Sequence, residues 1–527
     1  MADLLLVARI HTLDPARPVA EAALARDGRW VRVGGWGECS REAREGARTL
    51  EVPYAVPGLC DAHGHPFLLG RALQEVDLRG ARDEADCAAR VRARARETPP
   101  GSWLRGRGWD QNGWPGADFP TRASLDAAAP AHPVLLMRVD GHAAWVNGRA
   151  LEAAGISGTT ADPAGGKILR DASGEPTGVL VDSAFDPVLR ALPHESPEEV
   201  ARTLALGLAA LPRAGLTEVH EAMATPQILA AYRRLAREGR LPVRVYAMID
   251  GQVPLPELDA RIAARGPAEE GRLTVRAVKL FADGALGSRG AALLAPYADE
   301  PGTRGLLLLE PPELRERLRR VVLAGLQPAV HAIGDRACRE VLQALVELRR
   351  ELPGLDALRP RVEHLQILAA EDRGLLRAAG VVASMQPVHA TSDGAWAERR
   401  VGPARAEGAY PLRWALDAGA TLALGSDFPV EDPDPRAGLW AAEARIPAGA
   451  TAPWTPAQRL TRTEALRGFT AGAAQAAFAE GRRGAIREGL DADATLLGGD
   501  LLAVPVDELR ELPVLGTIVG GEAAPER

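Results

Sequence analysis

Residues 52–66 read VPYAVPGLCDAHGHP, an apolar run that ends in two histidines, His63 and His65. Side chains two residues apart on a β-strand point to the same face, so both imidazoles project together if this run is a strand. At the C-terminal end of a barrel strand, an inward-facing pair of this kind can bind one metal ion. An isolated His-x-His pair is equally compatible with ordinary core histidines, so its meaning depends on the other ligand-type residues of the chain.

Short apolar runs alternate with longer helical patterns through the rest of the sequence. The runs include VRVYAMI (243–249), VRAVKLF (275–281), PAVHAI (328–333), VVASMQP (381–387) and ATLALGSD (420–427). Residues 196–199 (SPEE) and 455–458 (TPAQ) each carry a capping-box pattern that predicts a helix start. Strands that alternate with helices indicate parallel βα units. So many units predict an α/β fold of the (β/α)₈ TIM-barrel type.

The pattern also predicts the domain organisation. Residues 1–57 and 480–527 hold short strands with glycine between them, and we expect them to form one small β-sandwich-like domain. Residues 58–479 are the expected barrel. Residues 70–190 fit the alternation poorly, are rich in Trp, Gly and Pro, and include a hairpin pattern at 165–181. They are predicted to be an insertion after the first barrel strand that shapes the substrate pocket.

Composition narrows the classes of partner and compartment. The net charge is −7 and the sequence has no basic block, which argues against a nucleic-acid partner. No run of about 18 apolar residues predicts a membrane span. Residues 1–15 resemble a first strand rather than a signal peptide. Four scattered cysteines without a C-x-x-C pair favour free thiols in the cytoplasm.

Three further residues of the metal-ligand type end apolar runs in the same way. His331 follows PAV, His364 follows RVE, and Asp427 follows TLALGS. Each alone is as compatible with a core histidine or a helix-capping aspartate. Together with His63 and His65 they give five residues at the position where barrel strands end, which favours a metal site.

Lys279 lies inside the apolar run 275–281. Burial disfavours the ammonium ion and lowers the pKa of a lysine toward a neutral amine. A neutral amine can react with carbon dioxide to form a carbamate, whose two oxygens can bridge two metals; arginine cannot do this because it stays protonated. The chain has only one other lysine, Lys167. The alternatives are an unmodified active-site lysine, or a lysine that reaches water or pairs with Asp283.

The order H-x-H, Lys, His, His, Asp resembles the metal-dependent amidohydrolase superfamily. Several longer blocks are similar to amidohydrolase family 3, the group that contains N-substituted formamide deformylases. They are GLCDAHGHP (58–66), VDGHAAWVNGRAL (139–151), VKLFADGALGSRGAAL (278–293), HAIGDRA (331–337), RVEHLQ (361–366), SMQPVHATSD (384–393) and LGSDFPVEDPDP (424–435). The resemblance runs from about residue 50 to residue 475, with the blocks in order.

The resemblance implies a ligand set of His63, His65, Lys279, His331, His364 and Asp427 around one or two divalent ions, with zinc as the expected metal. His63 and His65 would hold the more buried ion with Asp427. Carboxylated Lys279 would bridge to a second ion held by His331 and His364. The metal would lower the pKa of water to about 7. Asp427 would be the catalytic base and then the acid, in hydrolysis of a carbon–nitrogen bond of a small amide or formamide. The family also implies a homo-oligomer such as a homodimer.

Four residues are weaker candidates for substrate contacts. His142 and Gln386 lie in family blocks, with a structural hydrogen bond as the alternative for each. Trp109 could line an apolar pocket or belong to the core or a lid. Asp283 could pair near Lys279 or hold the 281–288 turn. His389 and His220 are further candidates near the same end of the barrel.

Other reactions remain open on the same site because a fold does not determine its chemistry. They are deamination of a heterocycle and hydrolysis of an ester or lactone. A non-catalytic scaffold is a more remote alternative, disfavoured because all six ligand positions are filled.

Overall fold

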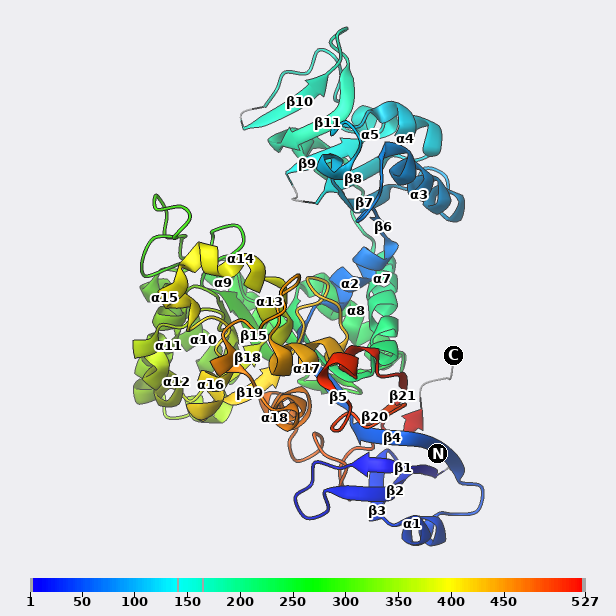
Figure 1. Ribbon diagram of the computed structural model, residues 1–527, viewed down its shortest axis with the longest axis vertical. Coiled ribbons are helices and arrows are strands. Elements are labelled where there is room, and N and C mark those ends of the chain that lie inside the picture. The colour runs from blue at the N-terminus through cyan, green and yellow to red at the C-terminus, as the bar shows by residue number, and fades with distance from the viewer. Residues whose placement is uncertain (1–2, 140–141, 164, 524–527) are drawn as a thin grey trace. The chain divides into compact units, whose positions relative to one another are not determined.

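The computed structural model describes residues 3–139, 142–163 and 165–523, and the chain forms two compact units (Figure 1). The first unit combines residues 1–69 with residues 200–527, and the second comprises residues 70–199. Within the described ranges, no helix is both long and apolar enough to cross a membrane.

The centre of the first unit is a nearly closed barrel of eight parallel strands, as the sequence predicted. In order around the sheet the strands are β5 (Leu59–Gly64), β12 (Leu216–Ala224), β13 (Arg244–Asp250), β15 (Leu273–Phe281), β16 (Gln327–Ala332), β17 (Arg361–His364), β18 (Val382–Met385) and β19 (Thr421–Leu424). The short β14 (Glu269–Glu270) pairs with β15. Beyond the end of β19, the Asp427 amide donates to the His63 carbonyl at 2.7 Å, so this edge of the sheet meets β5.

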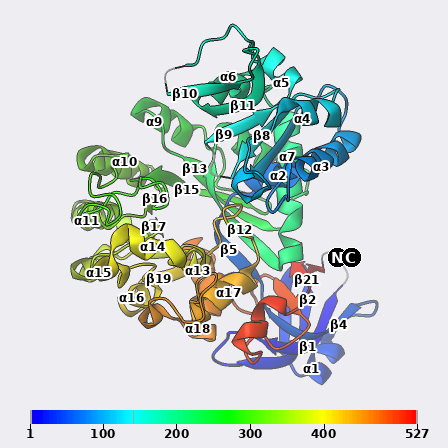
Figure 2. The same cartoon turned by 45° about the horizontal axis from the view of Figure 1, so that its top comes forward.

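Helices cover the outside of the barrel, and Figure 2 shows α10, α11, α16 and α18 outside strands β15 to β19. The larger ones are α7 (Pro197–Ala210), α8 (Pro226–Arg237), α9 (Leu255–Ala263), α10 (Pro311–Leu323), α11 (Asp335–Glu351) and α17 (Pro435–Ala444). The shorter ones are α2 (Pro66–Gln74), α12 (Arg373–Ala379), α13 (Pro387–Ser392), α14 (Gly394–Val401), α15 (Pro403–Ala406), α16 (Leu412–Asp417), α18 (Arg462–Arg467) and α19 (Ala473–Ala476). In α11, Val341, Leu345 and Leu348 are buried at helical spacing, which explains why this amphipathic segment packs against the strands.

The two predicted helix starts have different outcomes. Before α7, the Glu199 amide donates to Ser196 Oγ and the Ser196 amide donates to Glu199 Oε2, so the capping box at 196–199 is confirmed. The prediction at 455–458 is wrong. Thr455 has a left-handed backbone (φ 47°), makes no capping hydrogen bond, and precedes only a 3₁₀ turn. The capping box in this region is at Thr461 and Glu464, at the start of α18.

Both ends of the chain contribute strands to a single seven-stranded sheet. Its order is β22 (Glu522–Ala523), β21 (Val514–Val519), β20 (Ala494–Leu497), β4 (Arg48–Pro57), β1 (Leu4–His11), β2 (Val19–Arg26) and β3 (Arg29–Gly34). Strands β20 and β4 join the two ends in antiparallel register, with Ala494 opposite Pro57. Helix α1 (Trp36–Glu42) packs its buried Cys39 under β2. Packing of two sheets as a sandwich remains a prediction.

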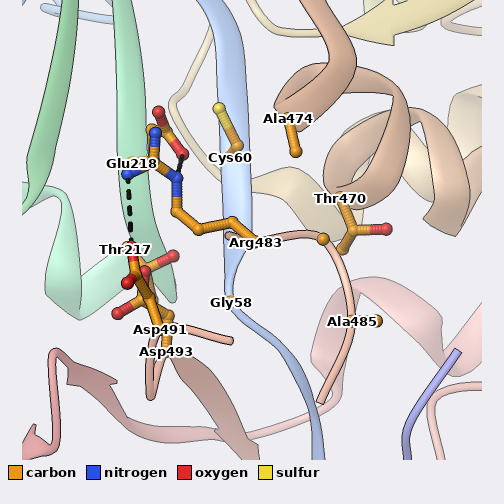
Figure 3. A pocket seen from close by; sticks show the side chains of 11 residues that line it. Gly58, Cys60, Thr217, Glu218, Thr470, Ala474, Arg483, Ala485, Asp491 and Asp493 are labelled. Carbon is orange, nitrogen blue, oxygen red and sulfur yellow. Dashed lines mark ion pairs between the residues drawn. The ribbon is translucent and has the colours of Figure 1, made fainter. Parts of the chain in front are cut away.

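Buried ion pairs connect the C-terminal segment to the start of the barrel strands. Arg244 on β13 makes a bidentate pair with Asp493, at 2.7 Å and 3.0 Å. Nearby, Arg483 Nε lies 3.0 Å from Glu218 on β12, beside a small cavity (Figure 3). The charges are taken out of water together, so removal of one member would leave its partner as an uncompensated buried charge.

The second unit has its own six-stranded sheet and core. The strand order is β10 (Gly166–Arg170), β11 (Pro176–Asp182), β9 (Ala143–Val146), β8 (Val134–Arg138), β7 (Leu104–Trp109) and β6 (Val76–Asp77). Its helices are α3 (Glu84–Glu97), α4 (Arg122–Ala128), α5 (Gly148–Ala153) and α6 (Asp186–Ala191). Strands β10 and β11 form the antiparallel hairpin predicted at 165–181.

Candidate metal centre

The six residues predicted as metal ligands all lie at the C-terminal ends of barrel strands. His63 and His65 are in and just beyond β5, Lys279 is near the end of β15, His331 is in β16, His364 ends β17, and Asp427 follows β19. In a (β/α)₈ barrel, active sites are built at this end of the strands.

Four of these side chains lie close together inside the barrel, namely Asp427, His63, His65 and Lys279. Asp427 Oδ1 lies 3.3 Å from His65 Nε2 and 3.6 Å from His63 Nε2. Lys279 Nζ lies 3.4 Å from the same His63 Nε2. One carboxylate oxygen, two imidazole nitrogens and one amine therefore converge on a common point inside the barrel.

Each histidine of the pair has a carboxylate next to its Nδ1 atom. His63 Nδ1 lies 2.5 Å from Glu363 Oε2, and His65 Nδ1 lies 3.4 Å from Glu221 Oε1. Hydrogen bonds of this kind fix the tautomer of a ligating histidine and leave the other nitrogen facing the metal. Glu363 is itself held by Arg361, whose Nε donates to Oε1 at 2.6 Å. The sequence reasoning did not single out Glu363, Glu221 or Arg361.

His364 is oriented by Gln386. Its Nδ1 lies 2.8 Å from Gln386 Oε1, and its ring centre lies 4.7 Å from that of His63 and 4.6 Å from that of His331. The observed contact of Gln386 is thus the structural hydrogen bond that was the alternative to a substrate contact, and it leaves Nε2 of His364 for the site.

Asp283 holds the loop that follows β15. Its carboxylate accepts backbone hydrogen bonds from Ala292, Ile333 and Gly334, and Oδ1 lies 3.5 Å from His331 Nε2. The side chain is fully buried, and burial raises its pKa to about 7. Its oxygens are engaged by backbone amides, which agrees with the alternative that Asp283 holds the local turn, and a substrate contact at Asp283 stays a prediction.

Burial controls the charge state of several groups at the site. It lowers the pKa of Lys279 to about 8, that of His63 to about 4 and that of His331 to about 3. Burial would also raise the pKa of Asp427, but the hydrogen bond from His65 and the charges of the neighbouring histidines hold that pKa far below its ordinary value. The site therefore combines an ionised Asp427 with uncharged His63 and His331. Burial would also lower the pKa of His65, but its hydrogen bonds to Asp427 and Glu221 raise that pKa to about 9, so a metal bound there would displace a proton.

The backbone is unusual at two of these positions. His364 has φ 72° and Asp427 has φ 61°, both in the left-handed region that residues other than glycine rarely adopt. Asp61 helps to hold the second turn, since it accepts hydrogen bonds from the Ser426 amide and hydroxyl beside Asp427. Strained backbone of this kind persists where the surrounding structure over-determines it, and it gathers at functional sites.

Three other candidates lie elsewhere. Trp109 is fully buried in the core of the second unit, where its Nε1 donates to the Leu136 carbonyl, as its core alternative describes, and a substrate contact at Trp109 stays a prediction. His142 is an exposed residue of that unit and lies 2.8 Å from Asp182. His220 is fully buried inside the barrel, 2.9 Å from Arg361. The structure does not place the second unit relative to the barrel.

His389 is a further histidine at the site. It lies on α13, directly after β18, and its ring stacks nearly parallel to that of His364 at 6.3 Å. Its Nε2 is buried and has no hydrogen-bond partner among the described residues. Burial of a polar atom without a partner costs roughly 1–3 kcal/mol of folding free energy, and a ligand bound to this nitrogen would offset that cost.

These residues fit a divalent metal. Two groups place their ligand atoms within 4.8 Å of one another, namely His63 with His65 and Asp427, and His364 with His389 and Asp427. Imidazole and carboxylate are common zinc ligands. The unpartnered nitrogen of His389 and the ionised Asp427 shared by both groups provide the donors and the negative charge that a cation needs.

Comparison with known proteins agrees with this arrangement. The family model described as "Amidohydrolase family" matches residues 53–524, which is most of the chain. The chain belongs to the amidohydrolase family. An N-substituted formamide deformylase of Arthrobacter pascens is 30% identical over 548 residues, covering 100% of this chain and 99% of that protein. The protein LONG AFTER FAR-RED 3 of Arabidopsis thaliana is 32% identical over 539 residues, covering 99% and 91%.

The fold of this amidohydrolase is also similar to that of a solved metal-dependent hydrolase. An uncharacterised metal-dependent hydrolase from Pyrococcus horikoshii matches with a TM-score of 0.80 at 26% identity, covering 96% of this chain and 99% of that one. The chain is therefore a metal-dependent hydrolase of the amidohydrolase superfamily.

Proposed function

We propose that this amidohydrolase cleaves an amide-type carbon–nitrogen bond of a small molecule, with N-substituted amides and formamides as the substrate class. The observation that carries the proposal is the convergence of His63 and His65 on the single carboxylate of Asp427, with Lys279 against His63. The full-length likeness to a formamide deformylase supports the choice of bond.

We propose His63, His65, Lys279, His331, His364 and Asp427 as the residues that hold one or two divalent ions, with zinc as the metal. A bound ion of this kind supplies Lewis-acid polarisation of a carbonyl oxygen and lowers the pKa of water at the site. The chemistry of Lys279 supports its carboxylation, because its buried amine lies against His63 rather than beside a carboxylate that would hold it as an ammonium ion.

Asp427 is the group that moves the proton in this proposal. Its ionised carboxylate accepts a proton from the attacking water and returns it to the leaving nitrogen, as general base and then general acid. A carbon–oxygen bond forms, the carbon–nitrogen bond breaks, and the products are a carboxylic acid and an amine. Glu363 and Glu221 keep the His63 and His65 rings oriented throughout.

The setting of the enzyme belongs to the same proposal. All four cysteines are free and buried, which fits a reducing cytoplasm. The family resemblance supports a homodimer as the assembled form. The substrate is a small molecule, and the second unit is the part of the chain that we propose to shape its pocket.

The test is a substrate panel on zinc-loaded protein. It comprises an N-alkyl formamide, an N-aryl acetamide, the matching ester, a lactone and an aromatic heterocyclic amine, with release of amine, acid and ammonia measured separately. We expect amine and acid from the amides, and loss of turnover after chelation. Ammonia from the heterocycle without amide turnover would make the enzyme a deaminase, and turnover of the ester or lactone alone would make it an esterase or lactonase. Full activity in metal-free protein would exclude the metal-dependent mechanism.

A further inference from the structure

His389 occupies a position in the barrel that the expected ligand set does not use. The sheet runs β17, β18, β19, so the ends of these three neighbouring strands carry His364, His389 and Asp427 in turn. Each strand end thereby contributes one nitrogen or oxygen to the same side of the barrel mouth. The ligand atoms of the three side chains lie within 4.8 Å of one another.

The environment of each member leaves a donor atom free for a cation. Nδ1 of His364 is engaged by Gln386, which leaves Nε2. Nε2 of His389 is buried and unpartnered among the residues that the structure describes, and the whole residue is only 8% exposed. Asp427 uses Oδ1 toward His63 and His65, and its second oxygen can serve the other group.

We propose that His389 is a metal ligand, and that it contributes to the second metal position together with His364 and Asp427. Two imidazoles and one carboxylate are the donor set of a zinc site that keeps an open position for a substrate or water. The inference rests on the proposed metal-dependent function and extends it by one ligand, because the resemblance to the family implies only His331, His364 and carboxylated Lys279 for the second ion.

His331 has the same kind of free donor atom as His389, because its Nε2 is also buried and without a hydrogen-bond partner among the described residues. Its Nε2 lies 3.5 Å from Asp283, a carboxylate already tied to three backbone amides, and His331 belongs to neither group of converging ligand atoms. His389, on the opposite side of His364, is the histidine whose donor atom meets both His364 and Asp427.

The experiment is a titration of metal-free protein with zinc alone, read by calorimetry and by competition with a chromophoric chelator. Wild-type protein is expected to bind ions in two steps. His389→Ala is expected to keep the first step and to weaken the second at least tenfold, as His364→Ala does. His194→Ala, at an exposed histidine of the second unit, is the matched control and is expected to bind as wild type does.

A second readout uses cobalt(II) in place of zinc. Loss of a histidine ligand changes the intensity and position of the visible absorption bands of the second ion, whereas loss of a residue that touches only substrate does not. Thermal unfolding of His389→Ala and of the substitution His389→Gln identifies any variant that has failed to fold. At least one folded variant with the weakened second step is expected.

The outcomes separate this inference from the proposed function. Unchanged affinity for both ions and unchanged cobalt bands in a folded His389 variant would overturn the ligand assignment, even if its KM for an amide rises. Wild-type protein that binds a single ion, with an affinity that His389→Ala does not alter, would also overturn it and leave the hydrolase standing. Wild-type protein that binds no ion would contradict the proposed function itself.

Discussion

Glu363 and His63 form a direct pair inside the barrel, with Oε2 of the carboxylate 2.5 Å from Nδ1 of the imidazole. Both side chains are fully or almost fully buried, and they come from strands far apart in the sequence, β17 and β5. Arg361 donates a hydrogen bond to the other oxygen of Glu363, so the orientation of His63 depends on the ion pair between Arg361 and Glu363.

Replacement of Glu363 by glutamine should weaken metal binding without removing a metal ligand. The substitution keeps the size of the side chain but removes the charge that orients His63, and loss of such a partner typically lowers metal affinity 10–100-fold. Competition with a chelator measures the change. Glu371→Gln, at an exposed glutamate of the same loop region, is the control. Wild-type affinity in folded Glu363→Gln would contradict the positioning role.

Replacement of Asp427 by asparagine should reduce kcat more than any other neutral substitution at the site. Asparagine has nearly the same shape but cannot accept and return the proton, and general acid–base catalysis typically contributes about 10²–10⁴-fold to a rate. Steady-state kinetics on protein with measured metal content tests this. Asp432→Asn, an exposed neighbour, should leave kcat unchanged. A fall in kcat that is fully restored by excess metal would show that Asp427 acts only as a ligand.

Substitution of Lys279 should lower the number of bound ions. We expect about two ions per wild-type chain if carboxylated lysine bridges them, and one or fewer in Lys279→Ala. Lys279→Arg keeps a positive charge but cannot form a carbamate, so it should lose metal as the alanine variant does. Elemental analysis gives the count, and Lys167→Ala, at the only other lysine, is the control. One ion in every variant would indicate a mononuclear site in which Lys279 has no bridging role.

Loss of Arg244 should destabilise the whole first unit. The substitution Arg244→Met leaves Asp493 buried without its bidentate partner, and removal of one member of a buried ion pair typically costs about 3–5 kcal/mol. Urea unfolding measures the change in the free energy of unfolding. The exposed Arg240→Met serves as control. The double variant Arg244→Met with Asp493→Leu should recover much of the loss, and a double variant no more stable than the single one would contradict this account.

The barrel, and the place of the ligand-type residues at the ends of its strands, could be predicted because each depends on local sequence. An apolar run that ends in His, Lys or Asp marks a strand end, and in a barrel all such ends meet at the same mouth. His63, His331, His364 and Asp427 each followed this rule, and the rule needs no knowledge of which strands are neighbours.

The partners of those residues could not be predicted in the same way. Glu363 and Glu221 act on histidines from another strand, so their roles depend on the register of the sheet. A signal was nevertheless present, since Arg361 and Glu363 lie two residues apart in β17 and therefore project to the same face of the sheet. The sequence leaves Trp109 open between a pocket wall and the core, and Asp283 open between a pair near Lys279 and a structural turn, because burial depends on the three-dimensional packing.

The pairing of β4 with β20 affects the order in which the protein can assemble during synthesis. Strand β4 emerges from the ribosome early, yet its neighbour β20 is translated only after every strand of the barrel. Until β20 has been synthesised, the edge of β4 that pairs with it is open to other chains. Arg244 also lacks its ion-pair partner Asp493 until that point. Synthesis of β20, rather than closure of the barrel, is therefore the step at which this sheet becomes safe from aggregation.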